Sequence, residues 1–114
     1  MYVKILFCIP KSIYLSSSYY CMNHFTVRFE LKLGIDEEYI ALDEQLIRFS
    51  FSDTIATEEG DTYILPRGEY RISGEFSRQK VLDLAILAAG DYRANCKILV
   101  TESNGTAWTG LTKV

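Results

Sequence analysis

Hydrophobic and polar residues alternate most regularly over residues 25–33, where Phe, Val, Phe, Leu and Leu are separated by Thr, Arg, Glu and Lys. Successive side chains of a β-strand point to opposite faces of a sheet. The pattern therefore predicts a strand with one buried face and one solvent face. Such alternation is typical of an antiparallel sheet that is covered on one side only.

Shorter stretches of the chain suggest further strands. Ile47, Phe49 and Phe51 alternate with polar residues, which predicts an inward-facing strand over residues 46–51. Residues 38–41 fit a short turn of helix or a strand. Further strands are expected over residues 2–9, 62–65 and 70–76.

A short phrase occurs twice. Leu-Pro-Arg-Gly-Glu-Tyr-Arg at residues 65–71 returns 22 residues later as Leu-Ala-Ala-Gly-Asp-Tyr-Arg at residues 87–93. In each copy a Gly follows an apolar stretch and precedes a new extended run, as at turns between consecutive strands. The repeat favours a strand over residues 84–87. The alternative is a helix near 78–89, with Ser77 as its cap and Gly90 at its end.

The carboxyl-terminal part contains Asn104-Gly105, the pair preferred in a two-residue type I′ turn. The flanking segments, residues 96–103 and 106–113, are therefore predicted to form a hairpin. This register places Thr101 opposite Trp108.

These elements predict an all-β fold, a single antiparallel β-sandwich of about seven to nine strands with its last hairpin at Asn104-Gly105. One domain would span residues 1–114. The runner-up is an α+β domain with one helix near residues 78–89.

Composition supports a globular, intracellular protein. Apolar residues make up 48% of the chain and charged residues 24%, which argues against general disorder. Three widely spaced cysteines and one histidine favour reduced thiols over a disulfide framework or a metal site, and no cofactor motif is present.

The amino terminus carries a short apolar run, but Pro10 and Lys11 interrupt it too early for a secretory signal. No stretch is long enough to span a membrane. A cytoplasmic location is therefore expected. If Met22 were the natural start, residues 1–21 would be an N-terminal extension.

The net charge of −3 hides an uneven distribution, because residues 36–61 hold nine carboxylates and one Arg. Three interpretations are open: a solvated surface, a cation site without the regular spacing of calcium loops, and a surface that recognises a basic partner. The acidic block argues against nucleic acid as a ligand. The nine residues are Asp36, Glu37, Glu38, Asp43, Glu44, Asp53, Glu58, Glu59 and Asp61.

The function expected is therefore that of a non-enzymatic binding protein. Its concrete form is an immunity protein or inhibitor that occludes a basic partner, such as a toxin or nuclease, with residues 36–61. The segment from Thr62 to Phe76 and its repeat resemble, in a general way, accessory β-sandwich modules and small bacterial nuclease inhibitors. The alternative is a small-ligand or carbohydrate-binding module. Its candidate contact residues are Tyr70, Arg71, Tyr92, Arg93 and Trp108.

Overall fold

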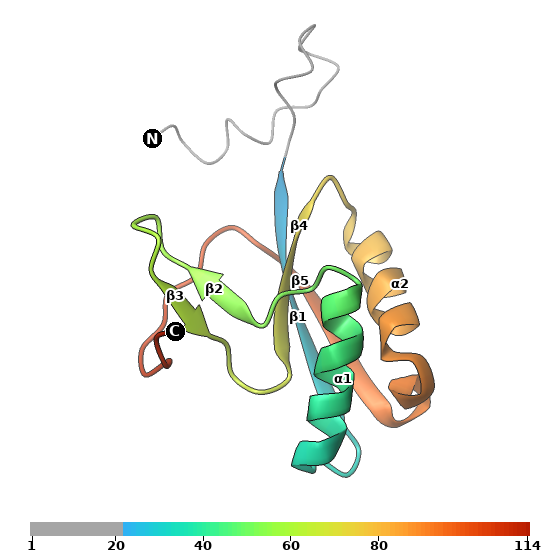
Figure 1. Ribbon diagram of the computed structural model, residues 1–114. Coiled ribbons are helices and arrows are strands. Elements are labelled where there is room, and N and C mark those ends of the chain that lie inside the picture. The colour runs from blue at the N-terminus through green and yellow to red at the C-terminus, as the bar shows by residue number, and fades with distance from the viewer. Residues whose placement is uncertain (1–21) are drawn as a thin grey trace, which may run out of the picture.

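The computed structural model describes residues 22–114 as an α+β fold (Figure 1). Within these described residues, two helices and five strands follow one another, with a 3-10 turn before the last strand. In order they are β1 (Asn23–Leu31), α1 (Asp36–Arg48), β2 (Thr54–Ala56), β3 (Thr62–Ile64), β4 (Glu69–Gly74), α2 (Arg78–Ala89), the turn at Gly90–Asn95, and β5 (Cys96–Ser103).

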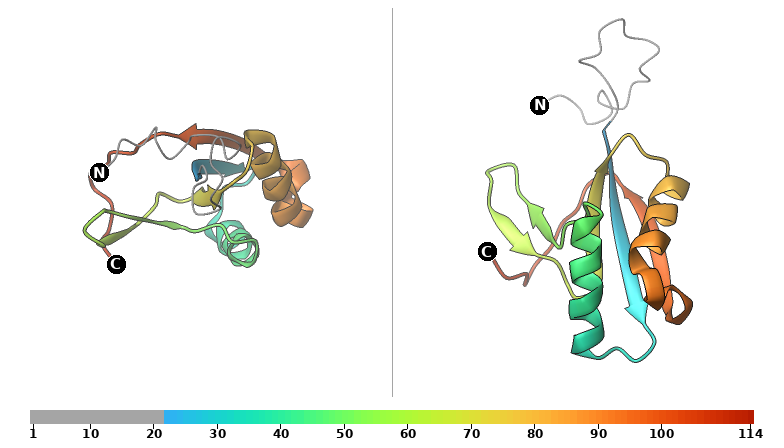
Figure 2. Two further views of the ribbon diagram at one scale, coloured as in Figure 1. Left: turned by 90° about the horizontal axis from the view of Figure 1, so that it is seen from above. Right: turned by 45° about the vertical axis from the view of Figure 1, so that its right-hand side comes forward.

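The main sheet has three strands in the order β4-β1-β5, and β1 pairs antiparallel with both neighbours. Because β4 and β5 are both antiparallel to β1, they run parallel to each other on its two sides. α2 connects them, which makes a split β-α-β arrangement. β2 and β3 form a separate antiparallel hairpin that projects from the sheet (Figures 1 and 2).

The core lies between the sheet and the two helices, which cover the same face of the sheet (Figure 2). β1 contributes Phe25, Val27, Phe29 and Leu31, all of them buried, and its alternating polar residues face the other side. Leu42 of α1, together with Leu46 and Val81, is fully enclosed against this row. The strand predicted over residues 25–33 is thus confirmed, although it ends at Leu31.

The predicted β-sandwich is wrong. Within the described residues there are five strands, in sheets of three and two, and the layer opposite the main sheet is helical. The runner-up α+β class matches this architecture and the position of α2, but it lacked α1.

The predicted strand over residues 46–51 is wrong, because residues 36–48 form α1. Tyr39, Leu42 and Leu46 are buried at helical spacing, whereas Ile47, expected to face inward, is 52% exposed. Three acidic residues in the first turn and Arg48 in the last suit the helix dipole.

The predicted strand over residues 84–87 is also wrong, because these residues belong to α2. The Ser77 hydroxyl accepts a hydrogen bond from the Lys80 backbone N–H (3.0 Å), and Gly90 ends the helix with a φ of 57°. The repeated Gly does mark a positive-φ turn in both copies, since Gly68 has a φ of 86°. The repeat therefore predicted the two positions where an element ends, but in the second copy both neighbours were predicted wrongly: α2 comes before Gly90, and a 3-10 turn over Gly90–Asn95 follows in place of an extended run.

The predicted hairpin at Asn104-Gly105 does not form. β5 ends at Ser103, whose hydroxyl donates to the Gly105 carbonyl (3.2 Å), and Thr101 pairs with Thr26 rather than with Trp108. The chain then crosses to the β2–β3 hairpin, where the Ile64 N–H donates to the Thr112 carbonyl (2.8 Å). Local side-chain hydrogen bonds at Ser103 thus compete with a continued ladder.

Two further expectations concern the amino-terminal segment and membrane-spanning helices. The strand expected over residues 2–9, and the cysteines at positions 8 and 21, lie outside the described residues. Neither helix in the described part combines the length and the apolar composition needed to cross a membrane.

Candidate functional site: an acidic groove

A groove of about 480 Å³ runs between α1 and the chain that connects β3 to β4. Residues three or four positions apart lie on the same face of a helix. α1 therefore turns Asp36, Asp43 and the two residues between them at positions 39 and 40 toward the groove. Asp53 and the β3–β4 connection form the opposite wall. Five carboxylates line the groove: Asp36, Asp43, Glu44, Asp53 and Glu69.

Gly68 fixes the wall of the groove against the sheet. Its carbonyl accepts a hydrogen bond from the Phe29 backbone N–H (2.7 Å). A Cβ built on Gly68 would lie 2.5 Å from the Phe29 carbonyl oxygen and 3.3 Å from the Tyr39 ring. The connection can approach β1 this closely only because residue 68 has no side chain.

Arg67 lines the exposed side of the groove and contacts one of its carboxylates and one of its aromatic rings. The guanidinium donates to the Asp36 carboxylate (2.7 Å) and stands 4.4 Å above the centre of the Tyr39 ring. The Tyr39 hydroxyl accepts in turn from the Leu31 backbone N–H (3.1 Å), which anchors the ring to the end of β1. The groove therefore already holds one guanidinium by an ion pair and a cation–π contact.

The other four groove carboxylates make no ion pair with a Lys or Arg of residues 22–114; they are Asp43, Glu44, Asp53 and Glu69. Their mutual proximity has an electrostatic consequence. Burial, followed by the nearby charge of Asp53, raises the pKa of Asp43, while hydrogen bonding with Tyr70 acts in the opposite direction. Burial and the charge of Asp43 likewise raise the pKa of Tyr70, which keeps its hydroxyl protonated.

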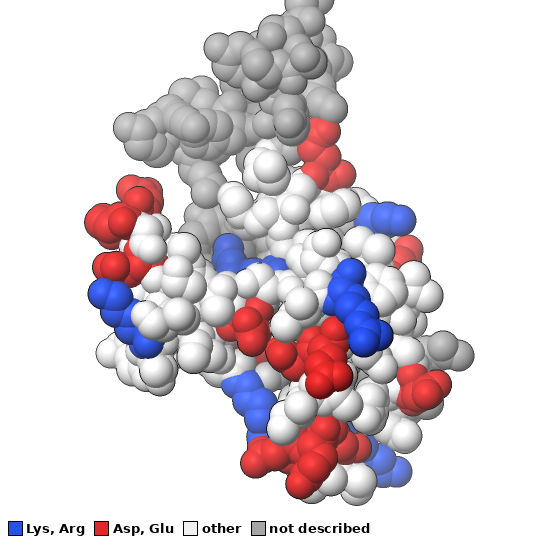
Figure 3. Space-filling view, viewed as in Figure 1, with Lys and Arg blue, Asp and Glu red and all other residues white. Residues whose placement is uncertain are grey.

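The nine predicted acidic residues do not form one surface. Asp36, Asp43, Glu44 and Asp53 meet in the groove, and Glu37 and Glu38 lie beside them in the first turn of α1. The remaining three belong to the β2–β3 turn, where Asp61 pairs with Lys113 (3.3 Å). Figure 3 shows acidic side chains over α1, with basic side chains next to them, apart from the acidic side chains at the tip of the hairpin.

Sequence reasoning missed three groove residues. Glu69, Tyr39 and Arg67 line the groove but are absent from the predicted site residues. The spacing of Asp36, Tyr39 and Asp43 could have revealed a shared helix face, had the segment been recognised as a helix. The proximity of Arg67 depends on the fold alone, since it is 31 residues from Asp36.

The alternative ligand-binding residues are also separated. Tyr70 is buried in the core and meets Phe29 edge-on at 5.7 Å between ring centroids. Arg71 points to the other face of the sheet and lines a cavity with Trp108. Tyr92 lies in the 3-10 turn at the far end of α2, and the side chain of Arg93 is outside the described part.

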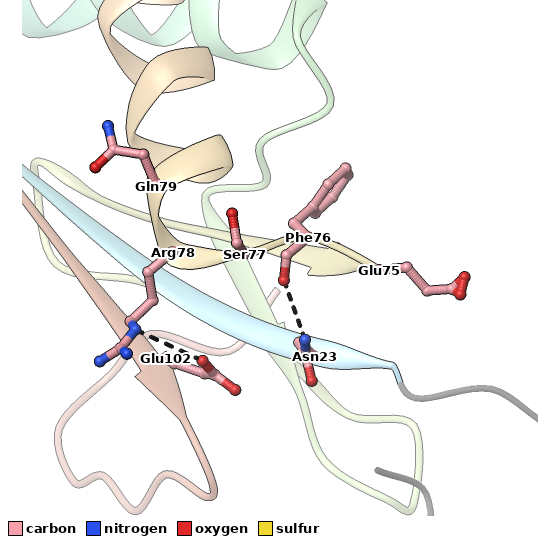
Figure 4. Close-up of a pocket in the computed structure, with 7 residues that line it drawn as sticks. All are labelled: Asn23, Glu75, Phe76, Ser77, Arg78, Gln79 and Glu102. Carbon is pink, nitrogen blue, oxygen red and sulfur yellow. Dashed lines mark hydrogen bonds and ion pairs between the residues drawn. The ribbon is translucent and has the colours of Figure 1, made fainter. Parts of the chain in front are cut away.

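A further cavity of about 760 Å³ opens at the amino-terminal end of α2 (Figure 4). Asn23 donates to the Phe76 carbonyl (3.0 Å), and Arg78 lies 3.9 Å from Glu102. In Figure 4, Glu75 and Gln79 are directed away from Arg78 and Glu102. The polar groups of this cavity do not converge on a common point, so we assign the cavity no chemistry.

Metal chemistry finds no support in the part of the chain that is described. Between residues 22 and 114, no three His, Cys, Asp or Glu side chains come together as a group that could hold a metal ion. Cys96 is half-buried at the start of β5, and burial raises the pKa of its thiol, which makes it a poor nucleophile.

Comparison with known proteins does not add an assignment. No family model, curated protein or solved structure matches the chain.

Proposed function

We propose that the protein is a non-enzymatic binding protein that holds a basic segment of a partner protein in the acidic groove. In its concrete form it is an inhibitor or immunity protein: the groove takes Lys or Arg side chains from the rim of a target's active site, and α1 blocks access to that site.

The observation that carries this proposal is the set of groove carboxylates without a basic counterpart among residues 22–114, namely Asp43, Glu44, Asp53 and Glu69. The pKa of Asp43 is raised first by its burial and second by the nearby charge of Asp53, so part of the shift reflects repulsion between groove carboxylates. A bound cation would relieve that repulsion. Perturbed groups of this kind cluster at functional sites more often than elsewhere.

Arg67 supports the proposal by example. It shows how a guanidinium fits this groove: one carboxylate in front of it and one aromatic face beneath it. Arg is also the basic residue that contributes most often to the energetic centres of protein interfaces. A partner's Arg would use Asp43 and Asp53 as Arg67 uses Asp36.

The test uses an eight-arginine peptide and the same peptide with citrulline, which is isosteric and neutral. Binding to the full chain is measured by calorimetry at about 0.05 and about 0.15 M salt, where screening lengths differ appreciably. The groove variant Asp43→Asn/Asp53→Asn/Glu69→Gln is compared with Glu37→Gln/Glu58→Gln/Glu59→Gln. Both variants remove the same number of charges, but only the first changes the groove.

We expect the groove variant to bind the arginine peptide at least about tenfold more weakly than wild type, since several charge-assisted contacts are lost. The control variant should lose less than about threefold, because none of its three carboxylates lines the groove and two of them, Glu58 and Glu59, stand on the β2–β3 turn. Equal losses in the two variants would mean that binding follows net charge, and the groove would not be the site. Partners captured by wild type but not by the groove variant would then be assayed for inhibition.

A further inference from the structure

A second cavity, of about 630 Å³, lies on the opposite side of the sheet from the helices. Its floor is the solvent face of β1 and β4, with His24 and Arg71. One wall is the β2–β3 hairpin and the other is the chain after β5. Its volume is within the range of small-molecule sites.

Arg71 is the central feature of this cavity. Its backbone is held on both sides, because Arg71 pairs with Thr26 of β1 and exchanges two backbone hydrogen bonds with Ser52 (2.7 and 2.8 Å). The Cα of Arg71 is therefore held at a fixed point of the sheet, and hydrogen bonds from Nη1 to Thr106 and Thr26 orient the guanidinium. A preorganised donor of this kind loses little freedom when it binds a ligand.

The contacts of the guanidinium leave one of its edges unused. Both side-chain hydrogen bonds start from Nη1, one to Thr106 (3.1 Å) and a longer one to Thr26 (3.4 Å). Among residues 22–114 no carboxylate lies within ion-pair distance of Arg71. The Nε–Nη2 edge can thus receive two oxygens of one oxyanion, the geometry for which Arg is suited.

The other lining groups restrict the ligand. Ile55, Ala56 and Trp108 provide apolar surface, and the Trp108 ring packs against Tyr63 at 5.5 Å between centroids. Glu58 and Glu59 line the hairpin wall. These two carboxylates disfavour a dianion more than a monoanion, because their repulsion scales with ligand charge.

We propose that this cavity binds a small organic carboxylate, with its oxygens on the Nε–Nη2 edge of Arg71 and a flat apolar body against Trp108. This cavity shares no lining residue with the acidic groove. A test of carboxylate binding here is therefore independent of a test of the proposed function.

The experiment uses Trp108 as the reporter, since it is the single tryptophan of the chain. The full chain is titrated with benzoate, with benzamide as the neutral isostere, and with phenyl phosphate as the dianion, and the Trp emission is followed. We expect saturable changes with benzoate, and binding at least about tenfold weaker with benzamide, because a charge-assisted bidentate contact is missing. Phenyl phosphate should bind more weakly than benzoate.

Variants locate the site. Arg71→Gln should bring benzoate binding down to the benzamide level, and Arg71→Lys should recover it only in part, because Lys lacks the planar pair of donors. Arg28→Gln is the matched control, since Arg28 is exposed on β1 and does not line the cavity. Far-UV circular dichroism verifies that each variant is folded.

Three results would overturn the inference. They are equal binding of benzoate and benzamide by wild type, an Arg71→Gln variant that is folded and binds benzoate unchanged, and tighter binding of phenyl phosphate than of benzoate. The first and third comparisons need only the wild-type protein, so they hold even if an Arg71 variant does not fold.

Discussion

Replacing Gly68 by Ala tests the packing that forms the groove wall. Residue 68 has a φ of 86°, and its Cβ would meet the Phe29 carbonyl oxygen at 2.5 Å. Two costs follow. An L-residue in the left-handed region loses about 1–2 kcal/mol, and forcing packed groups apart adds about 1–3 kcal/mol.

The expected loss is therefore about 2–5 kcal/mol, a large share of the roughly 5–15 kcal/mol by which domains are stable. Gly110 provides the control. Its φ of 81° is nearly the same, but nothing lies within 4 Å of its Cβ position. Gly110→Ala should therefore show the backbone cost alone, about 1–2 kcal/mol.

Urea unfolding followed by circular dichroism gives both free energies, and the difference between the two variants isolates the steric contact with β1. Gly60→Ala, with a φ of 95° and an equally open Cβ position, serves as a second reference. If Gly68→Ala cost no more than these two variants, the close approach of the β3–β4 connection to β1 would be wrong.

Further variants test the charges, the core and a helix cap. The pKa of Asp43 in the folded state is raised above its unfolded value of about 3.9. The protonated carboxyl therefore stabilises the folded protein below about pH 3.9, and this stabilisation is lost as the pH rises through the folded-state pKa. Asp43→Asn should flatten this loss in urea titrations between about pH 4 and 7, and an unchanged profile would contradict the shift. The pKa of Tyr70 is raised as well, so Tyr70→Phe should diminish the loss of stability above about pH 10, measured in the same way. Leu42→Ala, at a fully buried position, should cost about 2–5 kcal/mol, whereas Leu87→Ala, 63% exposed, should stay within about 0.5 kcal/mol. Ser77→Ala removes the cap of α2 and should cost about 0.5–2 kcal/mol by chemical denaturation, a value near zero arguing against the cap.

The sequence could predict an element of this fold where the pattern that specifies the element lies within a single short segment. The alternation in β1 and the cap and stop of α2 are encoded within a few residues. The first gave a correct prediction, whereas the helix indicated by the second was only the alternative to a strand favoured by the repeat. The ends of α1 carry suitable charges but lack a capping side chain and a terminating Gly. Its N-cap, Ile35, makes no side-chain hydrogen bond, and the left-handed position after the helix is occupied by Ser50 (φ 71°) instead of the usual Gly.

The candidate site was less predictable than the fold. The sequence showed that carboxylates are concentrated in residues 36–61, but their division between a groove and a hairpin turn depends on the intervening helix. The contact of Arg67 with Tyr39, and the pairing of the final residues with β3, are tertiary contacts. No pattern within one segment encodes them.

The central place of β1 has a consequence for how the protein is made. β1 leaves the ribosome before both of its neighbours, and its partners in β5 stand as far along the chain as Ser103, opposite His24. Translation must therefore proceed through β5 before this sheet can close. Until β4 emerges the nascent chain carries an apolar strand with two unpaired edges, and one edge stays unpaired until β5 follows, so the growing chain offers an edge for aggregation that the folded sheet no longer presents on β1.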